Sequence, residues 1–345
     1  MRKITRRSFL TAAVACGAAA ALSACGGSSS ASSAAASSTV ASASVAAASN
    51  GEKFTVGICQ LVQHAALDAA TQGFEDALTA SFGENVTFDF QNAQGDSATC
   101  ATIANGFVSS GVALIMANAT PALQAATAAT NSIPILGTSV TDYGTALSIA
   151  DWKGTTGTNV TGTADLAPLD KQAEMIKTLF PDKKNVGILY CSAEPNSKYQ
   201  STEITKYLTD AGYTCKEYTF ADSNDVAAVT KTACDESDVL YVPTDNTAAS
   251  CAESINNIAE PAKVPIVAGE SGICTGCGVA TLSIDYYDLG VVTGNMAYEV
   301  LVNGADPATT EIQFAPKTTY QYMADRCEKL GVKVPSDYVA IEAEK

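Results

Sequence analysis

The chain has 345 residues and a formal net charge of −16, from 20 Lys and Arg against 36 Asp and Glu. This acidic balance excludes nucleic acid as a partner, because phosphate binding requires clustered Lys and Arg. The length is sufficient for two lobes, each with a hydrophobic core of its own.

Residues 1–24 have the composition of an export signal. Basic residues come first, and an apolar, small-residue run covers residues 9–24, which is the layout of a signal peptide. The run is too short and too alanine-rich for a membrane-spanning helix, which needs about 20 strongly apolar residues. LSAC at residues 22–25 resembles the lipobox of bacterial lipoproteins, so a lipid on Cys25 is the expected anchor. TRRSFL at residues 5–10 also resembles a twin-arginine signal, and the export route stays open.

Residues 26–50 contain only Gly, Ser, Ala, Thr, Val and Asn. Such a segment cannot bury enough apolar surface to fold, so residues 25–52 are expected to be a lipidated cysteine and a flexible tether, with a reach of roughly 25–30 Å. The body that follows is therefore expected outside the cytoplasm, close to the cell membrane.

The cysteines allow two interpretations. Eleven are present, and nine remain in the body once Cys16 is removed with the signal and Cys25 is lipidated. Outside the cytoplasm some can form disulfides, with Cys274 and Cys277 as the nearest pair in the sequence. Alternatively, they are small buried apolar residues.

Apolar, strand-like runs occur in the same order in both halves of the body. In the first half they cover residues 54–59, 86–90, 113–117 and 133–137. In the second half they cover residues 186–191, 213–220, 239–242 and 264–269. Helical patterns such as residues 67–80 and 171–179 lie between them. This βαβα order predicts α/β lobes, each with a doubly wound parallel sheet covered on both faces.

The two halves are predicted to be copies of one lobe. The offset between matching positions is nearly constant, from Val56 to Val186 and from Pro134 to Pro265, which indicates a duplication. Two such lobes would be joined by a hinge and enclose a cleft. We expect one lobe to contain residues 53–163 and about 287–315, and the other to contain residues 164–286 and about 316–345. The crossings between them are expected near residues 162–166, 284–287 and 315–318.

Polar side chains follow the predicted strands, where ligands of open α/β sheets bind. The candidate binding residues are His64, Thr120, Ser139, Glu194, Asn196, Ser197, Asp245, Asn246, Thr247, Glu270 and Asp285. Thr120 followed by Pro121 predicts a helix start, with the threonine as N-cap and the proline at the first helical position. The cleft should therefore offer free backbone amides as well as side chains.

These residue types favour a zwitterionic ligand. Buried carboxylates at Asp245, Glu270 or Asp285 need a cationic partner, whereas the helix start at Thr120 and the hydroxyl of Ser139 suit an anion. We therefore expect an α-amino acid or a similar zwitterion, with its ammonium group near Asp245 or Asp285.

The sequence contains few residues and motifs that could act in catalysis. His64 is the single histidine, so an enzyme would have to use it as its general base. The sequence contains no G-x-S-x-G, H-E-x-x-H or G-x-x-x-x-G-K motif. Cys274 and Cys277 lack the companions of a zinc site. We expect no enzymatic activity, no metal and no cofactor, and a surface-tethered hydrolase using His64 is the remote alternative.

A family resemblance emerges from several short motifs. They are QHAALD (63–68), FQNAQGD (90–96), ATPA (119–122), NVTG (159–162), YVPTDNT (241–247), PIVAGE (265–270) and IDYYDLG (284–290). In this order, from residue 54 to about residue 339, the chain resembles the substrate-binding lipoproteins of ABC transporters. The family includes tryptophan- and tyrosine-binding members and has the type I periplasmic-binding-protein fold.

The resemblance implies a mechanism and partners. A monomer, held at the membrane by the lipid on Cys25, would close on a small solute and deliver it to an ABC permease powered by an ATPase. The implied ligand is an amino acid, with an aromatic one as the first choice. A sugar or nucleoside receptor on the same fold, and a sensor or adhesin without transport, stay open as alternatives. Departures at Ala65, at Tyr143 and at residues 271–274 affect which solute fits.

Overall fold

The computed structural model describes residues 53–342. The predicted signal segment, the lipid site at Cys25 and the predicted tether lie outside the described residues. Within residues 53–342, none of the helices combines the length and apolar character that a membrane crossing requires.

The first sheet is entirely parallel, with the strand order β11-β5-β4-β3-β1-β2. Its strands are β1 (Phe54–Gln60), β2 (Val86–Asn92), β3 (Leu114–Asn118), β4 (Ile135–Val140), β5 (Val160–Ala164) and β11 (Gln313–Phe314). The central strands β3 and β4 are buried along their whole length, as expected for a sheet with helices on both faces.

The second sheet has the order β13-β12-β10-β9-β8-β6-β7. Its strands are β6 (Asn185–Cys191), β7 (Thr214–Phe220), β8 (Val239–Val242), β9 (Ile266–Ala268), β10 (Ala280–Ile284), β12 (Thr318–Tyr322) and β13 (Val339–Ala340). Only the β10–β12 pair is antiparallel. The run β10-β9-β8-β6-β7 repeats the order β5-β4-β3-β1-β2 of the first sheet, which confirms the predicted duplication of an α/β lobe.

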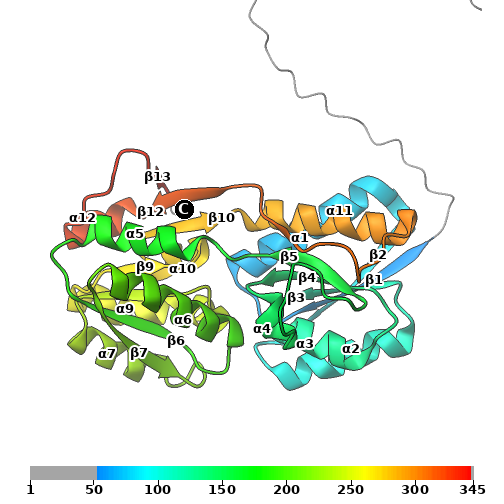
Figure 1. Cartoon of the computed structure of the whole chain (residues 1–345), viewed down its shortest axis with the longest axis horizontal. Helices are drawn as coiled ribbons and strands as arrows, with labels where there is room; N and C mark the ends of the chain where they lie inside the picture. Colours follow the sequence, from blue (N-terminus) through cyan, green and yellow to red (C-terminus); the bar gives the residue numbers. More distant parts are fainter. Residues whose placement is uncertain (1–52, 343–345) are drawn as a thin grey trace, which may run out of the picture. The chain divides into compact units, whose positions relative to one another are not determined.

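Helices cover both faces of each sheet (Figure 1). Against the first sheet lie α1 (Ala65–Phe82), α2 (Ser97–Ser110), α3 (Thr120–Ala129), α4 (Tyr143–Leu147) and α11 (Tyr286–Asn303), and a short 3₁₀ turn covers Gly83–Asn85. Against the second lie α5 (Leu169–Leu179), α6 (Pro195–Asp210), α7 (Val226–Glu236), α8 (Asn246–Ser250), α9 (Ala252–Ala262), α10 (Ser271–Cys277) and α12 (Ala324–Leu330). Each sheet is therefore the middle layer between two hydrophobic cores.

All eight predicted runs contain a strand, although several bounds differ by one to three residues. The strands β5, β10, β11, β12 and β13 were not predicted. β5 has the sequence VTGTA, in which Thr161 and Thr163 are fully buried. Thr163 Oγ1 bonds Thr293 Oγ1 at 2.8 Å, and Thr161 Oγ1 donates to the carbonyl of Thr310 at 3.0 Å. Hydrogen-bonded hydroxyls therefore replace the apolar run that would have marked a strand.

The chain passes between the sheets three times: between β5 and α5, between β10 and α11, and between β11 and β12. Helix α11, from the second half of the sequence, lies alongside α1 in the first lobe (Figure 1). Glycines permit this close approach, because a Cβ atom at Gly290 would lie 2.0 Å from the carbonyl oxygen of Ala70. The first lobe is thus completed by a late segment of the chain.

Candidate functional site

The carboxyl ends of the parallel strands in the two sheets form two polar rims, and these rims are in contact. His64 Nε2, before α1, lies 3.2 Å from Asn246 Oδ1 at the start of α8. Gln200 Nε2, in α6, donates to Thr141 Oγ1 after β4, at 3.3 Å. The two rims therefore meet at these two contacts.

Thr120 and Ser139 lie on the first rim. Helix α3 begins at Thr120, and its N-cap is Ala119, with φ of 88° and no side-chain capping bond. The prediction that Thr120 caps the helix was therefore wrong, because the strained residue before it turns the chain. Ser139 also has a positive φ, 53°, and its buried Oγ has no hydrogen-bond partner. Backbone strain and an unpaired polar atom are features that cluster at binding sites.

His64 lies at the end of the first rim and is half-buried. Asn246 Nδ2 donates to Glu194, so its Oδ1 is left to accept from the Nε2–H group of His64. His64 Nδ1 is buried and has no partner in the described structure. The ring therefore has one buried nitrogen that is free to contact a ligand.

Glu194 organises the second rim. Its Oε2 accepts from Asn196 Nδ2, from the backbone N–H of Asn246 and from Asn246 Nδ2, at 3.1, 3.0 and 2.7 Å. Its Oε1 accepts from the backbone N–H and the hydroxyl of Thr247, both at 2.8 Å. Five donors saturate this carboxylate, so Glu194 holds the start of α8 and the side chains of Asn246 and Thr247 in place.

Asp245 is also bonded internally. Its Oδ2 accepts from the N–H of Cys191 and from Ser197 Oγ, both at 2.7 Å, and its Oδ1 accepts from the N–H of Ala248 at 2.7 Å. Burial, together with the neighbouring charge of Glu194, raises the pKa of Asp245 to about 8. The carboxylate is thus the N-cap of α8 and a partner of Ser197.

Asn196 keeps a free acceptor in the same rim. Its Nδ2 donates to the carbonyl of Thr244 at 3.1 Å and to Glu194. Its Oδ1 is buried and has no partner in the described structure. Buried acceptors are normally satisfied, so a donor from a ligand fits here.

Glu270 and Asp285 are both N-caps, in different settings. Glu270 is buried, caps α10 through the N–H groups of Gly272 and Ile273, and has its pKa raised by burial, while the nearby His64 acts in the opposite direction. Asp285 is exposed and caps α11 by accepting from the N–H of Asp288 at 3.1 Å. The structure therefore brings Glu270, but not Asp285, into the buried part of the site.

Four further residues of the interlobe region are absent from the candidate list drawn from the sequence: Thr141, Asp165, Gln200 and Tyr286. Asp165, between β5 and α5, accepts from Thr141 Oγ1 at 3.1 Å and from Tyr286 OH at 3.0 Å. Thr141 in turn accepts from Gln200. The signal was available, because Asp165 is the one charged residue in the crossing predicted at residues 162–166.

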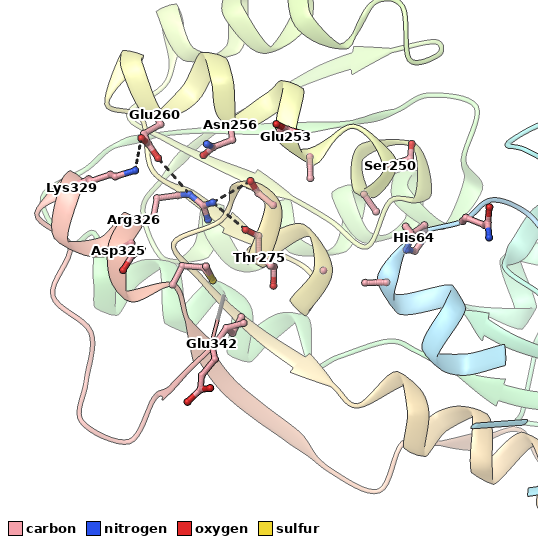
Figure 2. Close-up of a pocket in the computed structure, with 18 residues that line it drawn as sticks. His64, Ser250, Glu253, Asn256, Glu260, Thr275, Asp325, Arg326, Lys329 and Glu342 are labelled. Atoms are coloured by element: carbon pink, nitrogen blue, oxygen red, sulfur yellow. Dashed lines mark hydrogen bonds and ion pairs between the residues drawn. The ribbon is translucent and has the colours of Figure 1, made fainter. Parts of the chain in front are cut away.

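Several cavities border the rims, and two of them contain candidate binding residues of the second rim or His64. One of about 200 Å³ lies between the rims and is lined by Leu61, Val62, Gln94, Gly95, Ser97, Pro121, Cys191, Ala193, Glu194, Ala221, Asp222, Ser223, Asn246, Thr247 and Ser250. A second cavity, of about 870 Å³, extends from His64 along α9, α10 and α12 to Arg326 and Lys329 (Figure 2). There Arg326 donates to backbone carbonyls at the end of α10, and Lys329 pairs with Glu260 at 2.9 Å. The cations Arg326 and Lys329 are therefore paired with the protein itself, whereas Glu253, Asp325 and Glu342 of the same cavity take part in no ion pair of the described structure.

The remaining candidate groups are structural thiols. All nine cysteines of residues 53–342 are free, and Cys274 and Cys277 are buried in α10. The possibility of a disulfide between them is therefore not realised. Burial raises the pKa of Cys277 to about 12, which keeps its thiol protonated. No group of three or more His, Cys, Asp or Glu in the described part of the chain is placed to hold a metal ion.

Two duplicated parallel-sheet lobes with facing polar rims define a type I periplasmic-binding-protein-like receptor. The chain belongs to the family of ABC transporter substrate-binding proteins, because the model of the family described as ABC transporter substrate binding protein matches residues 55–345.

Individual relatives agree with this assignment. A protein of Clostridioides difficile (strain R20291) named tyrosine-binding protein is 40% identical over 276 residues, which cover 76% of this chain and 80% of the relative. The crystal structure of an ABC domain from Streptococcus pneumonia in complex with L-Trp is 32% identical with a TM-score of 0.80, covering 84% of this chain and 100% of that one. A ligand-free, open structure of a substrate-binding protein with adhesive properties from Clostridium difficile is 37% identical with a TM-score of 0.65 and the same coverage.

Proposed function

We propose that this protein binds an amino acid, preferably an aromatic one, between its two rims and delivers it unchanged to an ABC permease. The observation that carries the proposal is the set of buried, unpaired polar atoms at the rims: His64 Nδ1, Ser139 Oγ and Asn196 Oδ1. Such atoms are costly unless a ligand satisfies them. The tyrosine named for one relative and the L-Trp bound by another support an aromatic amino acid.

Binding would proceed by closure of the two lobes. A ligand shifts an open–closed equilibrium by as much as it prefers the closed state. The L-Trp complex superposes better on this structure than the ligand-free, open relative does, although the latter is more similar in sequence. This difference supports assigning the contacts of His64 with Asn246 and of Gln200 with Thr141 to the closed state.

We also propose that the protein is a membrane-anchored lipoprotein outside the cytoplasm. The support is the lipobox-like LSAC sequence at residues 22–25 and the uncharged segment after it. Metabolic labelling with a palmitate analogue should mark the full chain and leave the Cys25→Ser variant unmarked, with that variant released from the membrane fraction. Labelling of both proteins would argue against Cys25 as the anchor.

The ligand assignment is tested on the soluble body, residues 53–345. Thermal unfolding with each of the twenty amino acids, followed by calorimetry on those that raise the Tm, should identify aromatic amino acids as ligands. Mass spectrometry after prolonged incubation should recover the ligand unaltered, as transport without chemistry requires. A Tm raised by sugars or nucleosides and by none of the amino acids, or conversion of the ligand, would overturn the proposal.

A further inference from the structure

Asp165 lies where the chain first passes from one sheet to the other, and its carboxylate is almost completely enclosed. Its residue is 3% exposed. One oxygen accepts from Thr141 Oγ1 at 3.1 Å and the other from Tyr286 OH at 3.0 Å. Because a carboxylate can accept about four hydrogen bonds, Asp165 keeps acceptor capacity after these two neutral hydroxyls are counted.

The charge of Asp165 has no counterion in the protein. None of the ion pairs found within residues 53–342 includes it. The titratable groups that act on it are Tyr143 of α4, Tyr286 of α11 and Glu270 before α10, of which none is a cation. Burial, opposed by the two hydroxyl bonds and reinforced by Glu270, raises its pKa to about 6. A buried carboxylate in such surroundings is stabilised by an incoming cation.

Unpaired buried atoms in the same region indicate that a ligand occupies it. Asn196 is 6% exposed, and its Oδ1 has no partner. Its Nδ2 donates to the carbonyl of Thr244, which also accepts from Gln200, whose amide reaches Thr141 beside Asp165. Ser139, two residues before Thr141, is 6% exposed and also has a free, buried Oγ. These two unpaired atoms are evidence for a ligand that is separate from the Asp165 carboxylate.

The other carboxylates of the rims are less suited to a ligand cation. Glu194 accepts from five donors and Asp245 from three, all within the second rim. Glu270 accepts from two amides of its own helix, and the nearby His64 opposes the rise in its pKa. Asp285 is exposed. Among these buried carboxylates of the described structure, Asp165 is therefore the one that accepts from only two protein side chains and has no basic neighbour.

We propose that Asp165 binds the ammonium group of the amino-acid ligand, in place of the Asp245 or Asp285 expected from the sequence. The inference rests on the proposed function, because it requires a ligand with an amine. Asp165 also links Thr141, after β4, to Tyr286, at the start of α11 and next to a second passage between the sheets. The ammonium group thus binds at the hinge, where it also favours closure.

The test compares Asp165→Asn with the wild-type body by calorimetry, using L-tyrosine and L-tryptophan as probes. The exchange keeps the shape and removes the charge. We expect affinity to fall at least 100-fold, whereas the matched exchange Asp170→Asn, at an exposed position in the first turn of α5, changes it less than threefold. Folded Asp165→Asn protein that keeps affinity within threefold of the wild type overturns the inference and leaves the proposed function standing.

Two measurements on the wild type keep the inference testable if Asp165→Asn does not fold. The desamino analogue 3-(4-hydroxyphenyl)propanoate should bind at least 100-fold more weakly than L-tyrosine. Affinity for L-tyrosine should fall about tenfold per pH unit below about pH 6, because protonated Asp165 must lose its proton before it binds an ammonium group. Equal binding of the analogue, or constant affinity between pH 5 and 7, overturns the inference, whereas a wild type that binds no amino acid overturns the proposed function.

Discussion

Gln200 Nε2 donates a hydrogen bond to Thr141 Oγ1 at 3.3 Å and so connects α6 of the second lobe with the end of β4 in the first. Gln200 is itself fixed within its own lobe, because its Oε1 accepts from the N–H of Thr244 at 3.1 Å. Gln200 and Thr141 are both buried. The bond is therefore a direct contact between the lobes.

Replacing Gln200 with alanine should weaken ligand binding by opening the lobes. One lost hydrogen bond costs about 1 kcal/mol, so we expect the dissociation constant to rise about 3–10-fold, mainly through faster release. Stopped-flow dissociation measures this rate. Gln72→Ala is the matched control, since Gln72 is exposed on α1 and bonds only Asp76. Equal release rates in the two variants would contradict a role for Gln200 in closure.

Gly290→Ala should destabilise the first lobe. The added Cβ would lie 2.0 Å from the carbonyl oxygen of Ala70, so α1 and α11 would have to separate. Overpacking of this kind costs about 1–3 kcal/mol, which thermal unfolding detects as a lower Tm.

Gly106→Ala serves as the control for Gly290→Ala. Gly106 lies on the exposed side of α2, and nothing lies within 4 Å of a Cβ added there. Alanine favours the helix by about 0.5–1 kcal/mol over glycine, so the Tm of this variant should stay constant or rise. A Tm loss of the same size in both variants would show that the contact between the helices is not the cause.

The ligand-free body should be more stable at pH 5 than at pH 8. Burial raises the pKa of Asp165 to about 6 and that of Asp245 to about 8, against about 3.9 in an unfolded chain. Between these values the folded state binds more protons than the unfolded state, so the free energy of unfolding falls as pH rises. Carboxylates with a lowered pKa, such as Asp238, change the free energy of unfolding only at more acidic pH.

Urea denaturation at the two pH values measures this difference. We expect a higher midpoint at pH 5, and a smaller difference in Asp165→Asn, which lacks one of the two groups. A midpoint that is higher at pH 8 would show that both carboxylates are paired with cations in the folded protein.

The thiols should be protected in the folded body. Seven of the nine are buried, and only Cys215 and Cys251 are partly exposed. Native protein should therefore react with at most two equivalents of an alkylating reagent, and denatured protein with nine, as counted by intact mass. Rapid modification of Cys274 or Cys277 in native protein would mean that α10 opens readily.

Much of the fold was predictable from the sequence, because a strand covered on both faces must be a short, continuous apolar run. β8 (VLYV) is such a run, and the predicted and observed bounds agree. β5 was missed because its interior positions hold threonines whose hydroxyls bond to residues far along the chain. Long-range partners of this kind leave no periodic signal.

The candidate site was only partly predictable, for a similar reason. Polar residues at the strand ends indicate where the rims lie, and the structure places His64, Glu194 and Asn246 in direct contact. Which carboxylates are saturated internally depends on donors such as the N–H of Cys191, and the sequence carries no mark of that bond. Asp165 was overlooked because it lies in a crossing segment, away from the loops that follow the predicted strands.

The position of α11 has a consequence for how the protein is made. The first lobe lacks one of its covering helices until residues 286–303 have been synthesised, so the N-terminal half cannot complete its core as the chain emerges. An export pathway that carries unfolded polypeptide would therefore receive an unfinished first lobe for most of translation. Truncation before Tyr286 should yield an aggregation-prone fragment instead of an autonomous half-receptor.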